Sequence, residues 1–91
     1  MKVLVLYRQK SDHRQVVEDL LREYRRLHPE TKIETLDLDS REGIATASLY
    51  DVTAYPSFLA LRNDGSLLQL WQGQDEMPRI DDISYYASDQ L

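Results

Sequence analysis

Basic side chains gather in one short stretch near the start of the chain. Arg8, Lys10 and Arg14 lie within a span of seven residues, and Asp12 is the one acid between them. A predicted helix begins in this stretch, and a helix N-terminus exposes unpaired N–H groups that bind anions. The pattern predicts that this stretch binds a phosphate, a carboxylate or an acidic peptide segment, the alternative being a solvated loop.

Ser11 and His13 lie in the same stretch and invite a nucleophile-and-base interpretation. The neighbouring cations are expected to lower the pKa of His13. A spacing of two places the two side chains on different faces of a helical turn, and no third group is assigned to orient the histidine. We therefore predict no hydrolysis and assign no catalytic residue.

The rest of the chain offers no metal or thiol chemistry. His28 is far from His13, and the acids are scattered, which is not the spacing of a metal site. Asp37 and Asp39 alternate at the end of a predicted strand; they could hold a cation weakly, but solvation or capping of the next helix is expected. The chain has no cysteine, which excludes disulfides, thiolate-bound metals and thiol catalysis. No metal and no cofactor are predicted.

Composition and charge indicate one domain without a membrane or nucleic-acid partner. The 91 residues carry eleven basic and sixteen acidic side chains, a net charge of −5, which disfavours nonspecific nucleic-acid binding. Residues 1–32 hold eight basic and five acidic residues, whereas residues 33–91 hold three and eleven, an asymmetry that could steer a charged partner. No apolar run is long enough for a membrane span or a signal peptide. We expect a single domain over residues 1–91, located in the cytoplasm.

Strands and helices alternate around the basic stretch. Residues 3–7 form a continuous apolar run, which indicates a strand buried on both faces. A helix of about four turns is predicted next, with Ser11 or Asp12 as its N-cap and Glu18 paired with Arg22. Its apolar stripe consists of Val16, Val17, Leu20, Leu21, Tyr24 and Leu27.

Pro29 ends that helix, because the residue before a proline resists helical geometry. Residues 32–39 are predicted to form a second strand. Ser40 can cap a second, weaker helix that runs to about Tyr50.

Two further strands form a hairpin. Residues 57–62 and 67–71 are apolar, and the Asn-Asp-Gly-Ser turn between them favours antiparallel pairing. Trp71 is expected to lie in the core or half-buried against a last helix, which Pro78 would begin. The order β-α-β-α-β-β-α calls for a parallel pair with a right-handed crossover in a mixed sheet.

Residues 36–73 resemble the second half of a thioredoxin. The run from Thr53 through Tyr55 and Pro56 to Ser57 resembles the cis-proline loop of that family, and Gly73 falls where the family carries a glycine after the last strand. The resemblance implies an α/β thioredoxin-like fold, with a four-stranded mixed sheet flanked by helices.

The first part of the chain departs from the family at the redox site. The family carries Cys-x-x-Cys at the start of the first helix, and that place is taken here by residues 11–14 or 12–15. The buried acid of the family would fall at Val5 or Leu6, which are apolar. We therefore expect no thiol–disulfide oxidoreductase activity.

A binding or interaction module is the function expected first, with an extended peptide or a protein as its partner. The alternative is a domain of glutathione-transferase type with a small thiol or anionic ligand, in which Ser11 would bond the thiolate and Arg8 or Arg14 would hold carboxylates. A structural subunit of a larger complex is a third option. The predicted ligand-binding residues are Arg8, Lys10, Ser11, Asp12, His13, Arg14, Tyr55 and Pro56.

Overall fold

The chain follows the predicted alternation of strands and helices. A computed structural model describes residues 1–88. Its elements are β1 (Lys2–Tyr7), α1 (Arg14–Leu27), β2 (Lys32–Asp37), α2 (Arg41–Leu49), β3 (Ser57–Leu61), β4 (Leu67–Gln72), a 3₁₀ turn η1 (Gln74–Glu76) and α3 (Ile80–Ser88). The predicted order is therefore confirmed, with η1 as an addition.

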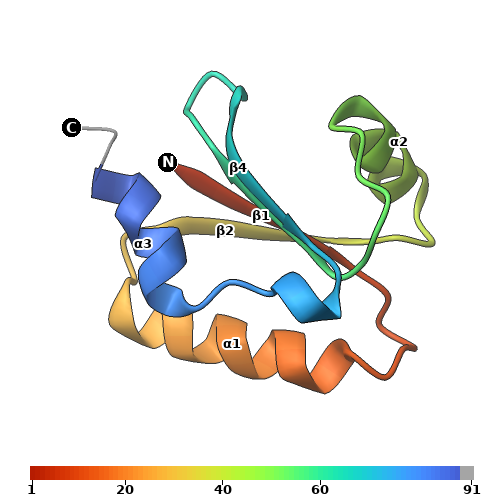
Figure 1. The fold of residues 1–91 in the computed structure, drawn as a ribbon, viewed down its shortest axis with the longest axis horizontal. Helices are drawn as coiled ribbons and strands as arrows, with labels where there is room; N and C mark the ends of the chain where they lie inside the picture. Colours follow the sequence, from red (N-terminus) through yellow and green to blue (C-terminus); the bar gives the residue numbers. More distant parts are fainter. Residues whose placement is uncertain (89–91) are drawn as a thin grey trace.

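The four strands form one mixed sheet in the order β2-β1-β3-β4. β1 and β2 are parallel, so that Leu6 lies beside Leu36, whereas β3 is antiparallel to both β1 and β4. Helices α1 and α3 cover one face of the sheet, and α2 covers the other (Figure 1). This arrangement confirms the predicted fold class.

Each face of the sheet has its own apolar core, and β1 contributes to both. Val3, Val5 and Tyr7 face the α1 side, while Leu4 and Leu6 face the α2 side. Successive side chains of a strand point to opposite faces, so a strand buried on both sides is apolar throughout. The first core is completed by Val17, Leu21, Tyr24, Phe58 and Ile83, and the second by Leu38, Ala47, Val52, Leu59 and Leu61.

Trp71 is half-buried on β4, as predicted. It packs against the first core, and its ring meets that of Tyr86 on α3 edge-to-face, with 5.7 Å between centroids. The aromatic pair joins the last strand to the last helix.

The start of α1 differs from the prediction. His13, not Ser11 or Asp12, is the N-cap residue, and no side chain caps the helix. The Ser11 hydroxyl instead donates to the carbonyl oxygen of Arg8 at 2.5 Å, which closes a turn before the helix begins.

The predicted pair of Glu18 with Arg22 is also wrong. Glu18 lies 3.2 Å from Nε of Arg14 and accepts a long hydrogen bond from the Tyr7 hydroxyl at 3.5 Å. The Glu18 carboxylate therefore contacts Arg14 and Tyr7 and not Arg22. Arg22 pairs with Asp19 instead, at 3.1 Å.

The ends of β2 and α2 are set by a tight turn. β2 stops at Asp37, two residues before the predicted end, and the N–H of Ser40 donates to the carbonyl oxygen of Asp37 at 3.0 Å. Ser40 caps α2 as predicted, accepting from the N–H of Gly43 at 3.0 Å. A Cβ atom on Gly43 would lie 2.1 Å from the Asp37 carbonyl oxygen, so this close approach requires glycine.

Helix α3 begins at Ile80, two residues after the predicted Pro78. The chain first makes the η1 turn, and the backbone N–H of Arg79 donates to the Asp82 carboxylate at 2.9 Å. The carboxylate of Asp82 thus reaches back to the residue before the helix, as in a capping box.

Candidate functional site

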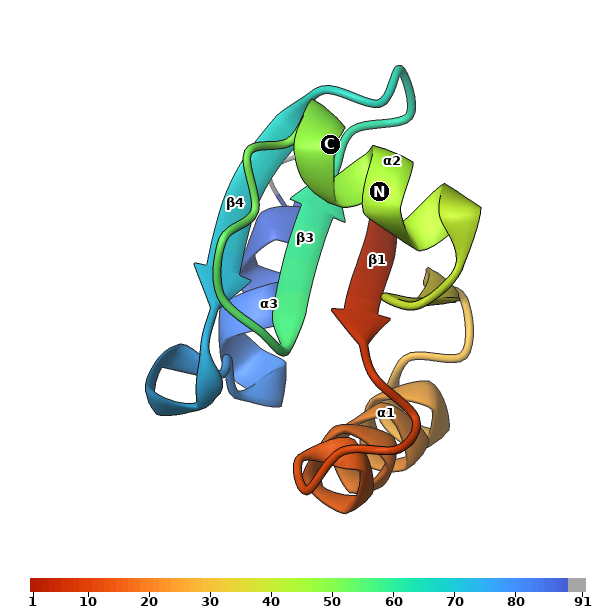
Figure 2. The same cartoon turned by 90° about the vertical axis from the view of Figure 1, so that its right-hand side faces the viewer.

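The loop after β1 lies beside the segment that enters β3. The two strands are antiparallel, with Leu6 opposite Ser57, so the end of one meets the start of the other (Figure 2). Arg8 and Tyr55 consequently line one pocket of about 420 Å³, together with residues of and near α2. The other lining residues are Leu38, Asp39, Ile44, Ala47, Ser48 and Val52.

The loop before β3 is held by a side chain from β4. The peptide bond between Tyr55 and Pro56 is cis. The Gln72 side-chain oxygen accepts hydrogen bonds from the backbone N–H groups of Thr53 at 2.9 Å and Ala54 at 3.2 Å. Gln72 can reach this loop because it pairs with Ser57, the first residue of β3.

Two more hydrogen bonds fix the other side of the loop. The Ser57 hydroxyl donates to the carbonyl oxygen of Ala54 at 2.5 Å, and the N–H of Gly73 donates to the carbonyl oxygen of Pro56 at 3.0 Å. Within residues 1–88, by contrast, neither the N–H nor the C=O of Tyr55 has a hydrogen-bond partner. The loop is therefore fixed on both sides of one residue whose backbone groups are free.

The loop after β1 is organised around the backbone of Arg8. Its carbonyl oxygen accepts from the Ser11 hydroxyl, and its N–H donates to Nε2 of His13 at 3.4 Å. Burial, and after it the Arg8 guanidinium, lowers the pKa of His13 below its ordinary value, against the opposing effect of Asp12. The pKa of His13 is therefore lowered, as predicted, although burial contributes more than the neighbouring cation.

The predicted basic cluster is only partly assembled. Arg8, Ser11 and His13 are joined by hydrogen bonds, and Arg8 shares a pocket with Tyr55. Arg14 points elsewhere, to Glu18, and the side chains of Lys10 and Asp12 are exposed, with no ion pair among residues 1–88. The Ser11 hydroxyl donates its hydrogen bond to the carbonyl oxygen of Arg8, which disfavours a role in bonding a thiolate.

The pocket beside Tyr55 carries one ion pair that the sequence did not reveal. Nε of Arg8 lies 3.4 Å from Oδ1 of Asp39, and both side chains are more than half exposed. Such a pair contributes little to stability, about 0–1 kcal/mol. Since it is weak, both charges can turn to a ligand at low cost.

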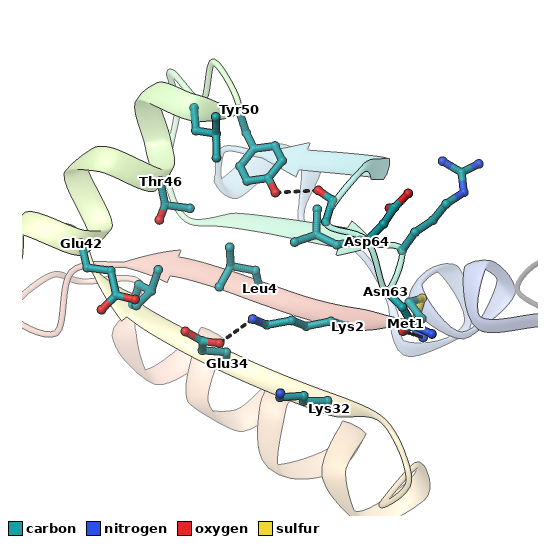
Figure 3. Close-up of a pocket in the computed structure, with 15 residues that line it drawn as sticks. Met1, Lys2, Leu4, Lys32, Glu34, Glu42, Thr46, Tyr50, Asn63 and Asp64 are labelled. Carbon is teal, nitrogen blue, oxygen red and sulfur yellow. Dashed lines mark hydrogen bonds and ion pairs between the residues drawn. The ribbon is translucent and has the colours of Figure 1, made fainter.

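A second pocket of about 500 Å³ lies on the other side of α2 and contains none of the predicted site residues (Figure 3). Some of its polar groups are paired with one another, whereas Lys32 and Glu42 have no ion pair within residues 1–88. Nζ of Lys2 lies 2.6 Å from the Glu34 carboxylate, which lowers the pKa of Glu34, and the Tyr50 hydroxyl donates to the Gly65 carbonyl oxygen at 2.7 Å. Because none of the predicted site residues lines it, this pocket is a weaker candidate than the one beside Tyr55.

Metal and membrane sites are not found in the described part of the chain. No group of three or more His, Cys, Asp or Glu side chains within residues 1–88 could hold a metal ion. No helix among those residues has the length and apolarity to span a membrane.

Comparison with known proteins finds solved structures with the same fold, but no match among family models or curated proteins. No protein-family model matches the sequence, and no curated protein matches it either. Among solved structures, a malarial protein aligns with a TM-score of 0.73 at 17% identity, covering 98% of this chain and 94% of that one. Mitochondrial thioredoxin 3 from Saccharomyces cerevisiae aligns with a TM-score of 0.65 at 20% identity, covering 98% of this chain and 76% of that one.

Thioredoxin 1 from Thermosipho africanus aligns with a TM-score of 0.69 at 14% identity, covering 98% of this chain and 97% of that one. These identities are low, so the likeness concerns the backbone. Together with the strand order and the helices on both faces of the sheet, the alignments establish the architecture. The protein has a thioredoxin-like fold, and its sequence contains no cysteine.

Proposed function

We propose that this chain is a redox-inactive binding module that takes an extended segment of another protein against Tyr55 and the loop of residues 8–14. The observation that carries the proposal is the free backbone of Tyr55 within an otherwise fixed loop. An extended peptide binds through main-chain hydrogen bonds, and an N–H and a C=O on one fixed residue can supply two of them.

The surroundings of Tyr55 suit such a segment. The pocket of about 420 Å³ next to it is lined by apolar side chains, including Ile44 and Val52, and can accept one side chain of the segment. Arg8 and Asp39 stand at the same pocket as one positive and one negative group. Main-chain bonds would provide affinity, and this pocket would provide selectivity.

The first turn of α1 supports an acidic residue in the bound segment. This turn contains no acidic side chain and no side-chain cap, and the N–H groups of Gln15 and Val16 have no partner within residues 1–88. Unpaired N–H groups at a helix start favour a negative charge. A carboxylate in the bound segment would meet that need.

The test is a ¹H–¹⁵N NMR titration with an eight-residue peptide of alternating valine and glutamate. We expect saturable shifts at Arg8, His13, residues 53–55 and Ser57. Reduced glutathione and inorganic phosphate serve as comparison ligands. Saturation by glutathione at these positions, with none by the peptide, would replace the module by the glutathione-transferase alternative. Shifts from neither the peptide nor glutathione would reject both functions.

We include a cytoplasmic location in the proposal.

A matched pair of variants locates the site. Arg8→Gln removes one charge from the pocket and should weaken peptide binding severalfold. Arg22→Gln removes a guanidinium from the middle of α1 that is 73% exposed, compared with 57% for Arg8, and that pairs with Asp19. If both variants weaken binding alike, the peptide is responding to net charge and the assigned site is wrong.

A further inference from the structure

A groove of about 680 Å³ separates α1 from the segment that leads from η1 into α3. Both elements lie on the same face of the sheet, on the side away from α2 (Figure 1). Leu20, Met77 and Ile80 line this groove, and they also pack half-buried against the first core. The groove is thus rooted in the folded core, and it shares no residue with the pocket beside Tyr55.

Two large aliphatic side chains of α1 stand exposed along the groove. Val16 is 54% exposed and Leu27 is 47% exposed, and both line it together with Leu20. Spacings of four and seven residues place these three side chains on one flank of the helix. Single exposed aliphatic residues are ordinary on protein surfaces, whereas a row that continues into half-buried neighbours is an apolar patch.

The opposite rim of the groove is acidic. Asp81 lines the groove, whereas Asp75 and Glu76 lie in η1 next to the lining residue Gln74, and none of the three acids has an ion pair within residues 1–88. Arg79, the one basic residue in the segment from 74 to 82, also lines the groove, and the segment as a whole is acidic because it holds four acidic residues. The three acids of α1, by contrast, are each paired with an arginine: Glu18 with Arg14, Asp19 with Arg22 and Glu23 with Arg26.

We propose that this groove binds an amphipathic helix of a partner protein, whose apolar stripe is flanked by lysine or arginine. A helix laid in an apolar groove is an established mode of recognition, and its anchors recur every three or four residues. Val16 and Leu27 are eleven residues apart, about 17 Å along α1, which matches a partner helix of about three turns. The basic flank complements the unpaired acids of the rim.

The probe is a synthetic 14-residue peptide of leucine and lysine with the leucines at helical spacing. A ¹H–¹⁵N titration is expected to give saturable shifts at the three α1 residues, at Met77 and at residues 79–81. The dissociation constant should rise with salt. Two control peptides keep the length: one replaces every lysine by glutamate, and one alternates leucine and lysine. Equal binding of either control would overturn the proposed helix with its basic flank.

Variants distinguish binding in the groove from a general attraction between charges. Val16→Lys and Leu27→Lys together should raise the dissociation constant at least tenfold, because they place two cations where the apolar stripe would rest. Leu49→Lys is the matched control, since Leu49 is 73% exposed on α2 at the other face of the sheet. Circular dichroism checks that each variant is folded.

A second pair of variants tests the rim. Asp81→Asn should weaken binding about threefold and reduce its salt dependence, whereas Asp51→Asn, an exposed change after α2, should leave both unchanged. Equal effects within either pair of variants would contradict the proposal. Sedimentation of the free protein gives an independent check: self-association that the Val16→Lys and Leu27→Lys changes abolish would identify a second copy as the occupant and overturn the partner helix.

Discussion

The side-chain oxygen of Gln72 lies 2.9 Å from the backbone nitrogen of Thr53 and accepts its hydrogen bond. The same oxygen accepts from Ala54, so one side chain of the last strand holds two consecutive N–H groups of the loop before β3. These two hydrogen bonds hold the loop just before Tyr55, whose own backbone groups are free.

Gln72→Leu is expected to destabilise the fold and weaken peptide binding together. Two N–H groups lose their acceptor, which should cost about 1–2 kcal/mol in the free energy of unfolding. Urea denaturation measures the stability and the NMR titration measures the binding. Gln69→Leu on the same strand is the control, and a loss of stability as large there would show that the Gln72 contact contributes nothing of its own.

His13 makes the stability depend on pH. Its pKa in the folded chain lies below the ordinary 6.5, because it is partly buried and near Arg8. As pH falls through about 6.5, the unfolded chain takes up the proton first, so the free energy of unfolding decreases toward acid pH.

Urea denaturation at about pH 7.5 and 5.5 tests this, in the wild type and in His13→Gln. The glutamine keeps a neutral hydrogen-bond acceptor, so the variant should lose part of the acid sensitivity. His28→Gln is the control. An unchanged pH dependence in His13→Gln, or an equal change in His28→Gln, would contradict the assignment to His13.

Gly43→Ala should destabilise the protein although alanine favours helices. The new Cβ would lie 2.1 Å from the carbonyl oxygen of Asp37, and this backbone atom is fixed in the turn before α2. Overpacking costs about 1–3 kcal/mol, and we expect the upper part of this range, which exceeds the gain of about 1 kcal/mol from helix propensity. Ser48→Ala, at an exposed position of the same helix, should change the free energy of unfolding by under about 0.5 kcal/mol.

Tyr50→Phe tests the contact between α2 and the hairpin turn. It removes the hydrogen bond from the Tyr50 hydroxyl to the carbonyl oxygen of Gly65, 2.7 Å away, and should cost about 1 kcal/mol. Tyr85→Phe changes an exposed tyrosine and should leave the urea midpoint where it is. Equal midpoints for the two variants would show that the Tyr50 bond adds no net stability.

The fold could be predicted because its signals are local. The apolar run of β1, the Asn-Asp-Gly-Ser turn and the Ser40 cap each specify an element without reference to the rest of the chain. The start of α1 could not be predicted in the same way. Ser11 is a good capping residue, and only the folded loop shows that its hydroxyl donates to the carbonyl oxygen of Arg8 instead.

The partners in the candidate site depend on strand register, which the sequence leaves open. Gln72 reaches Thr53 and Ala54 because it lies opposite Ser57. Asp39 reaches Arg8 because Tyr7 and Asp37 are neighbours in the parallel pair. The contact of Gln72 with the loop before β3 could be anticipated from the predicted hairpin, because the last strand of that hairpin has to end near this loop.

The position of β1 has a consequence for how the protein opens. β1 has a strand on each side, and its side chains belong alternately to the two cores. Neither core can loosen alone without disturbing the strand that the other also uses. We therefore expect one cooperative unfolding transition, with the amide hydrogens of Leu4, Val5 and Leu6 among the last to exchange with deuterium.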